Sequence, residues 1–155
     1  MIQFSTTVRN ILSQPTIEAF YLVEVYVSSG TTYRSTTYYR DVVITNNSVP
    51  VTTYYNDGKL VQVDSPRLSS TVDRELFKIS FADPTFTFGA SVDSGLIGKL
   101  VDVKVGFVNQ TTKLPELDIA NLLTVYRGKI DSTEYSINTS VTGEVLLNVS
   151  CSSPM

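Results

Sequence analysis

The sequence contains no histidine and only one cysteine, Cys151. The Ser-His and Cys-His pairs used by many nucleophilic hydrolases therefore cannot form. The usual zinc, iron–sulfur and haem sites are excluded as well, because they need histidine or several cysteine ligands. Cys151 falls on the apolar face of a predicted strand, which favours a place in the core. These absences predict a protein with no cofactor, no metal centre and no enzymatic activity.

Charge is also in short supply. Charged residues make up 17% of the chain, whereas about a quarter is usual. The formal net charge is −3 and the pI is about 4.8, and the lysines and arginines are scattered along the chain. This balance argues against a protein that binds nucleic-acid phosphates tightly. A surface so poor in charge is typical of an ordinary β domain or of a subunit that lies against neighbours.

Long apolar runs are missing too. No stretch approaches the roughly 20 apolar residues of a membrane-spanning helix, so we expect no membrane span. The first residues, MIQFSTTVRN, lack the basic and apolar regions of a secretory signal peptide. We therefore expect a protein that is made and assembled in a cytoplasm.

The residues that are plentiful are those of β-sheets, including 9 Tyr and 7 Phe. We find about nine strand-like runs separated by turn residues, with no βαβ rhythm and no internal repeat. The pattern predicts an all-β fold, either a β-barrel or a two-sheet sandwich, with a short N-terminal helix or arm. The arm comprises residues 1–18, and a single β domain comprises residues 19–155. A helix from Ser5 to Leu12 would pack on its own domain or reach a neighbouring subunit.

Two long runs between Leu96 and Ile137 organise the β domain. In the first, valines and a phenylalanine alternate with Asp102, Lys104 and Gly106, which predicts a half-buried strand. In the second, residues 123–137, the alternation changes phase after Ile130, which predicts a bulge or a bend. Gly128 lies in this run and would either let a neighbouring backbone come close or let the strand bend.

Other patterns predict the surrounding elements. Residues 19–28 are apolar on both faces apart from Glu24, which predicts a strand that is either central in its sheet or covered on both faces. Asn56-Asp57-Gly58 separates two strand-like runs, 51–55 and 59–63, and predicts a type I′ hairpin. Thr45 to Ser48 predicts another turn. Further expected features are a helical turn at residues 91–97, a polar surface loop at residues 109–121 and a last strand at residues 144–151.

Two groups of residues follow from these patterns. The expected core includes alternating apolar side chains of two strands: Val103, Val105, Phe107, Phe77, Ile79 and Phe81. The candidate interface gathers tyrosines of the first half of the chain and two leucines of the polar loop: Tyr33, Tyr38, Tyr39, Tyr54, Tyr55, Leu114 and Leu117. The pair Tyr54 and Tyr55 serves either cross-strand packing or a ligand surface, and packing is favoured.

Asp73, Arg74 and Glu75 form a small charged cluster at a predicted strand junction. A solvated turn with local ion pairing is favoured over a calcium site, because calcium needs more oxygen ligands on a looping backbone. Asp73 and Glu75 are also the carboxylate pair that an enzyme would use, but nothing in the sequence orders them for catalysis.

The order of the predicted elements resembles that of a known family. The segments that carry the likeness are Tyr21-Leu-Val-Glu-Val-Tyr, Gly58-Lys-Leu-Val-Gln-Val, Arg67-Leu-Ser-Ser-Thr-Val, Glu75-Leu-Phe-Lys-Ile-Ser-Phe-Ala-Asp, Leu96-Ile-Gly-Lys-Leu-Val-Asp-Val-Lys-Val, Tyr126-Arg-Gly-Lys-Ile-Asp-Ser and residues 145–153. From Phe20 to Pro154, the chain resembles the upper tail-hub minor tail proteins of lambda-like long-tailed bacteriophages. Lambda-type members carry a cysteine-rich C-terminal extension that can hold an iron–sulfur cluster. With Cys151 alone, the resemblance brings no cluster to this chain.

The resemblance implies a structural protein at the tail tip of a virion. Such a subunit would form a ring, a homotrimer, that joins the distal tail protein to the central hub or fibre and lines the path of genome ejection. The alternative is a β-sandwich module that recognises a host-surface glycan or protein through its tyrosines. In a ring we expect neighbouring chains to order the arm and residues 31–47 and 109–121.

Overall fold

The computed structural model describes residues 4–28, 31–56, 60–63, 76–82, 98–138 and 144–152. Within these ranges the chain is almost entirely β-structure, so the prediction of an all-β fold with a short N-terminal helix is confirmed. The elements are α1 (Thr6–Leu12), β1 (Glu18–Ser28), β2 (Thr31–Thr36), β3 (Val42–Asn46), β4 (Val49–Tyr54), β5 (Leu60–Val63), β6 (Leu76–Ala82), β7 (Leu100–Asn109), β8 (Leu114–Pro115), the 3₁₀ turn η1 (Ile119–Asn121), β9 (Leu123–Asn138) and β10 (Glu144–Ser152).

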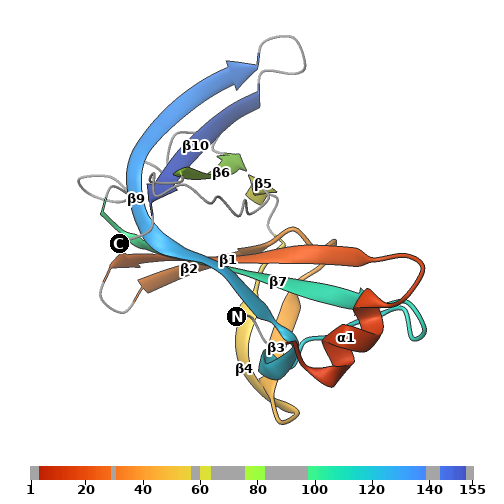
Figure 1. The fold of residues 1–155 in the computed structure, drawn as a ribbon. Helices are drawn as coiled ribbons and strands as arrows, with labels where there is room; N and C mark the ends of the chain where they lie inside the picture. The colour runs from red at the N-terminus through yellow and green to blue at the C-terminus, as the bar shows by residue number, and fades with distance from the viewer. Residues whose placement is uncertain are drawn as a thin grey trace.

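The described strands form one large curled sheet and a small second sheet. The large sheet follows the order β2-β1-β7-β9-β10-β6-β5, with β8 paired to β7, and β3 and β4 form the second sheet (Figure 1). Every strand pair along the large sheet is antiparallel. The curl brings Tyr33 of β2 against Phe81 of β6, with ring centroids 6.0 Å apart and an edge-on geometry. Side chains from the two ends of the sheet thus share one core.

Strand β9 makes this curl possible because it changes partner along its 16 residues. Its first half pairs with β7, and its second half pairs with β10 and bends away in Figure 1. The register shifts leave Val125 and Asp131 as extra residues, and each shift marks a β-bulge. The predicted phase change after Ile130 is therefore confirmed as a bulge at the next residue.

Gly128 lies where β9 passes from one partner to the other. A Cβ atom at this position would overlap the backbone carbonyl of Ser152 and the hydroxyl of Tyr126. The predicted close approach of a neighbouring backbone is confirmed, and it is the backbone of β10.

The inner face of the curled sheet holds the main core. Val23 and Val103 are fully buried there against Ile79, Phe81 and Leu147. Cys151 is buried in the same cluster, as expected. All six residues predicted for the core are buried: Val103, Val105, Phe107, Phe77, Ile79 and Phe81.

The opposite face of β1 and β7 is also covered. Phe20 and Leu22 of β1 pack there against Val42, Ile44 and Tyr54 of the β3–β4 hairpin. The prediction that β1 is covered on both sides is confirmed. The prediction that β7 is half-buried is wrong, because Asp102 is 5% exposed and Lys104 is only partly exposed.

The hairpins differ from the predicted ones. Strand β4 pairs with β3, and β5 pairs with β6 in the other sheet, so the expected hairpin of residues 51–55 and 59–63 is wrong. The two-residue turn with positive φ is found at Asn47 and Ser48, at φ of 50° and 68°, within the turn expected at residues 45–48. Burial explains why β4 pairs with β3 and not with β5. In this arrangement Tyr54 packs in the core that β3 and β4 form with β1. Residues 57–59 lie outside the described part of the chain.

The N-terminal helix packs on its own domain. Val8 and Ile11 of α1 are fully buried against Val105 and Phe107 of β7. Ser5 caps the helix by accepting a hydrogen bond from the backbone N–H of Val8. Of the two placements expected for the helix, packing on its own domain is therefore the one observed, because its apolar face is buried against β7.

The two segments expected to be ordered by neighbours are likewise held by this chain. Residues 31–47 contain β2 and β3, and residues 109–121 contain β8 and η1. The backbone N–H of Thr45 donates to the carbonyl of Leu117 at 2.9 Å, and that of Gln110 donates to the side chain of Gln14 at 3.0 Å. The predicted helical turn at residues 91–97 and the charged cluster at residues 73–75 lie outside the described residues.

Candidate functional site

Four charged residues form a row across the outer face of the curled sheet. In register, Arg34 of β2 lies opposite Glu24 of β1, Glu24 lies opposite Asp102 of β7, and Asp102 lies opposite Arg127 of β9. We call these four residues the charged row. Two carboxylates directly opposite each other repel, so each needs a cation on its other side. Across the row the charges are positive, negative, negative and positive, so each carboxylate has a cation beside it.

Glu24 is the most fully bonded member of the row. Its carboxylate accepts hydrogen bonds from Arg34 Nε at 2.8 Å, from the Tyr26 hydroxyl at 2.8 Å and from the Tyr54 hydroxyl at 3.0 Å. Burial alone would raise the pKa of Glu24, but these three bonds and the charge of Lys104 outweigh it, and the pKa is lowered. Glu24 is therefore a fixed negative charge at neutral pH, unsuited to act as a general acid.

The two tyrosines beside Glu24 are held in their neutral form. The hydrogen bond to Glu24, together with burial, raises the pKa of Tyr26 to about 12. Burial and the charge of Glu24 also raise the pKa of Tyr54. Tyr54 comes from β4, so its bond to Glu24 fastens the β3–β4 sheet to the large sheet.

Asp102 is deeply buried and is shared between two cations. Its Oδ2 atom accepts a hydrogen bond from Arg127 Nε at 3.0 Å. Its Oδ1 atom lies 3.2 Å from Lys104 Nζ, an ion-pair distance without hydrogen-bond geometry. The side chain of Arg127 is 72% exposed. Asp102 therefore binds the Nε atom of a guanidinium group that is otherwise largely open to solvent.

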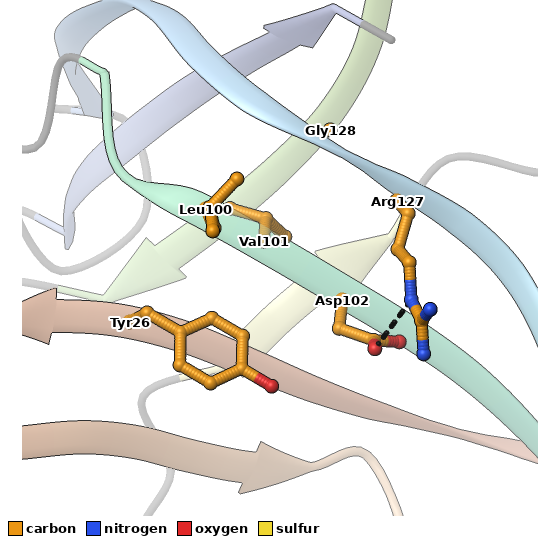
Figure 2. A pocket seen from close by; sticks show the side chains of 6 residues that line it. All are labelled: Tyr26, Leu100, Val101, Asp102, Arg127 and Gly128. Atoms are coloured by element: carbon orange, nitrogen blue, oxygen red, sulfur yellow. Dashed lines mark hydrogen bonds and ion pairs between the residues drawn. The ribbon is translucent and has the colours of Figure 1, made fainter. Parts of the chain in front are cut away.

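An open pocket of about 440 Å³ lies at one end of the row. It is lined by Tyr26 of β1, by Leu100, Val101 and Asp102 of β7, and by Arg127 and Gly128 of β9 (Figure 2). The lining is mostly apolar, and Arg127 is the charged group accessible from it. Pockets of this size hold a small molecule or one or two side chains of a partner.

Among the described residues, no group of three or more histidine, cysteine or acidic side chains gathers to hold a metal ion. The α-helix in these ranges has seven residues, well short of a bilayer span. The Cys151 thiol lies elsewhere, in the core, where burial raises its pKa to about 12.

The structure distributes the candidate interface residues over several environments. Tyr38 and Tyr54 are buried within the domain, and Tyr33 packs on Phe81 in the main core. Leu117 is partly buried against the core under β3 and β4. Three of the seven remain exposed: Tyr39, Tyr55 and Leu114. The ring of Tyr39 packs against that of Tyr38 at a tilt of 48°, and the guanidinium of Arg40 lies 5.4 Å from the centroid of the Tyr39 ring.

Sequence reasoning missed two features of this surface. Glu24 was visible as the polar residue in an apolar strand, but its partners Arg34 and Tyr54 come from β2 and β4, which only the tertiary structure brings to it. The second feature is the β3–β4 hairpin, where Val43, Val49 and Val51 are all exposed. Tyr55 follows β4 and is exposed as well. Alternation along β3 buries Val42 and Ile44 and leaves Val43 in solvent, and the first three residues of β4 are all exposed.

Comparison with known proteins identifies a shared fold. No protein-family model and no curated protein matches the sequence. Among solved structures, the chain is similar to one described as "Virion of native gene transfer agent (GTA) particle", with a TM-score of 0.57 and 12% identity. The match covers 95% of this chain and 44% of the other. The chain therefore has the fold of a region that makes up less than half of a chain in that particle.

Proposed function

We propose that the protein is a structural subunit of a phage-like virion. The observation that carries the proposal is the fold match, which covers 95% of this chain and lies in a virion particle. At 12% identity the shared property is the fold. The proposed position of the subunit in the virion, at the tail tip, comes from the resemblance of the sequence to upper tail-hub proteins. In this proposal the subunit forms a ring, a homotrimer, at the tail tip. The ring joins the distal tail protein to the central hub or fibre and surrounds the path of genome ejection.

The exposed apolar residues support a role in assembly. Val43 and Val51 are exposed on one hairpin, Val49 is exposed beside its turn, and Tyr55 follows directly after β4. Apolar and tyrosine-rich surfaces that are poor in charge gain most from contact with a neighbouring protein. We therefore place the principal contact between subunits on the outer face of the β3–β4 hairpin. The protein is not an enzyme in this proposal.

The experiment compares particles that carry variants of this face. Val43→Asp with Val51→Asp places two charges on the outer face, where folding of the domain does not need the valines. We expect the isolated domain to keep its thermal stability, and the virions to lack tails or tail tips in electron micrographs. Thr6→Asp, on the exposed side of α1, is the matched control and should give normal particles.

Mass spectrometry of purified particles gives the second measurement. Wild-type particles should contain the chain, and the double variant should be missing from them. If the chain is absent from wild-type particles, the proposal is wrong. If the double variant is incorporated and intact tails lose only adsorption to host cells, the chain is the alternative, a module that recognises a host-surface glycan or protein.

A further inference from the structure

The pocket beside the charged row contains an arginine, Arg127, whose terminal nitrogens are available to a ligand. Arg127 uses its Nε atom to bind Asp102, and its two terminal nitrogens have no hydrogen-bond partner among the described residues. Asp102 is 5% exposed and fixes the position of the guanidinium. Figure 2 shows the Arg127 side chain descending from β9 to Asp102, across from Tyr26 and Leu100. A fixed guanidinium with free terminal donors is the usual partner of a carboxylate.

The charges around the pocket favour an anion over a cation. Asp102 cannot serve an incoming cation, because its Oδ1 atom is buried and its Oδ2 atom is already bonded to Arg127. Glu24 is likewise occupied by Arg34 and two tyrosines. Lys129 is exposed and lies opposite Leu100 in register, so it is a further cation beside this lining residue.

The apolar part of the lining restricts the ligand further. The ring of Tyr26 is fixed by the hydrogen bond from its hydroxyl to Glu24, and Leu100 lies directly opposite Tyr26 in register. Both side chains are partly exposed, at 40% and 50%. Together they form an apolar side next to the guanidinium, which suits a ligand that has an apolar group beside its carboxylate.

We infer that this pocket binds an acidic side chain, with an apolar residue next to it, from an adjoining protein chain of the particle. The inference rests on the proposed function, because it takes the adjoining chain to be another virion protein. The apolar residue would lie on Tyr26 and Leu100, and the carboxylate would accept two hydrogen bonds from the terminal nitrogens of Arg127.

The first experiment measures binding of two blocked dipeptides to the isolated chain. The probes are acetyl-Leu-Glu-amide and acetyl-Leu-Gln-amide, which have nearly the same shape and differ in charge. In amide NMR spectra we expect the Glu peptide to shift the signals of Arg127, Gly128 and Leu100, and the Gln peptide to bind roughly tenfold more weakly. Equal binding of both, or shifts at other residues, would overturn the inference.

Variants test whether Arg127 is the group that binds. Arg127→Gln should abolish the difference between the two peptides, whereas Arg9→Gln, an exposed arginine on α1, should leave it unchanged. If loss of the partner of buried Asp102 prevents folding, the double variant Asp102→Asn with Arg127→Gln removes both charges together. Retained preference for the Glu peptide in a folded variant without Arg127 would contradict the inference.

Particles separate this inference from the proposed function. If the pocket seats an acidic segment of a neighbour, the folded Arg127→Gln chain should be incorporated several-fold less than the Arg9→Gln chain. Normal incorporation of Arg127→Gln would overturn the inference and leave the proposed function standing. Absence of the wild-type chain from particles would instead refute the proposed function, and the inferred partner with it.

Discussion

Strands β1 and β7 carry an apolar core on their inner face, whereas on their outer face they carry charged residues beside a second apolar cluster. On the inner face, Val23 and Val103 pack in a core without charge. On the outer face, Glu24 and Asp102 are nearly as buried, yet both are ionic and lie opposite each other. The inner face is stabilised by burial of apolar area, and the part of the outer face around Glu24 and Asp102 by a network in which every carboxylate has a cation.

This difference separates two roles within one sheet. An apolar core tolerates changes that keep volume and shape, so it specifies the fold through packing. A buried ionic row contributes less net stability, because the cost of removing charges from water offsets much of their attraction. The row does fix the relative positions of β2, β1, β7 and β9, and it leaves Arg127 oriented toward the pocket. The following predictions test this contrast, from the largest expected effect to the smallest.

Removing a large side chain from the inner face should have the largest effect. Phe107→Ala should lower the free energy of unfolding by about 3–5 kcal/mol, because it leaves a cavity between β7 and α1. Urea denaturation followed by circular dichroism measures the change. Ile119→Ala, at an exposed position, is the control and should stay within about 0.5 kcal/mol of the wild type. Similar losses for both variants would contradict the assigned core.

Breaking the outer face at its centre should cost less. Glu24→Ala removes the acceptor of three hydrogen bonds and should lower the free energy of unfolding by about 2–3 kcal/mol. Glu24→Gln keeps an oxygen acceptor and should cost less than Glu24→Ala. If the alanine variant is as stable as the wild type, the row has no structural role.

Gly128→Ala tests the crossing point of β9, on the inner face. The added methyl group would meet the carbonyl of Ser152, which is backbone and cannot move aside easily. We expect a loss of about 1–3 kcal/mol, measured by urea denaturation. Gly98→Ala is a partial control, because a Cβ at this position would meet no neighbouring atom. Any loss of stability in that variant would come from backbone strain at its φ of 85°.

Acid should weaken the outer face selectively. The pKa of Glu24 is lower in the folded protein than its ordinary value of 4.5. The unfolded chain therefore takes up a proton at a higher pH than the folded chain, and the stabilisation present above pH 4.5 is lost as the pH falls through the folded pKa. Denaturation between neutral pH and pH 3 should show a smaller acid dependence for Glu24→Gln than for the wild type. Identical pH profiles would show that Glu24 has no shifted pKa.

The smallest change in stability is expected at the exposed end of the row. Arg127→Gln should cost about 1 kcal/mol, because Arg127 is largely exposed and Asp102 keeps Lys104. Addition of salt should reduce the difference between this variant and the wild type. A loss as large as that of Glu24→Ala would mean that Arg127 is a structural member of the row rather than its open end.

The sequence by itself determined the strand character of the chain and much of its core. Alternation in β7 identified Val103, Val105 and Phe107 as buried, and the change of phase in β9 located a bulge. These properties depend on neighbours along the chain, whose side chains alternate between the two faces of a strand. The role of Gly128 followed for a similar reason, since a glycine within a strand allows a close approach whichever backbone makes it.

Only the tertiary structure decided which strands are partners, and the candidate site depends on those partners. The sequence favoured a hairpin at Asp57-Gly58, but β4 pairs with β3 because this places Tyr54 in the core and its hydroxyl on Glu24. The charged row joins residues up to 103 positions apart, from Glu24 to Arg127, through four strands in register. No local pattern encodes such a register, because it results from the packing of all the strands at once.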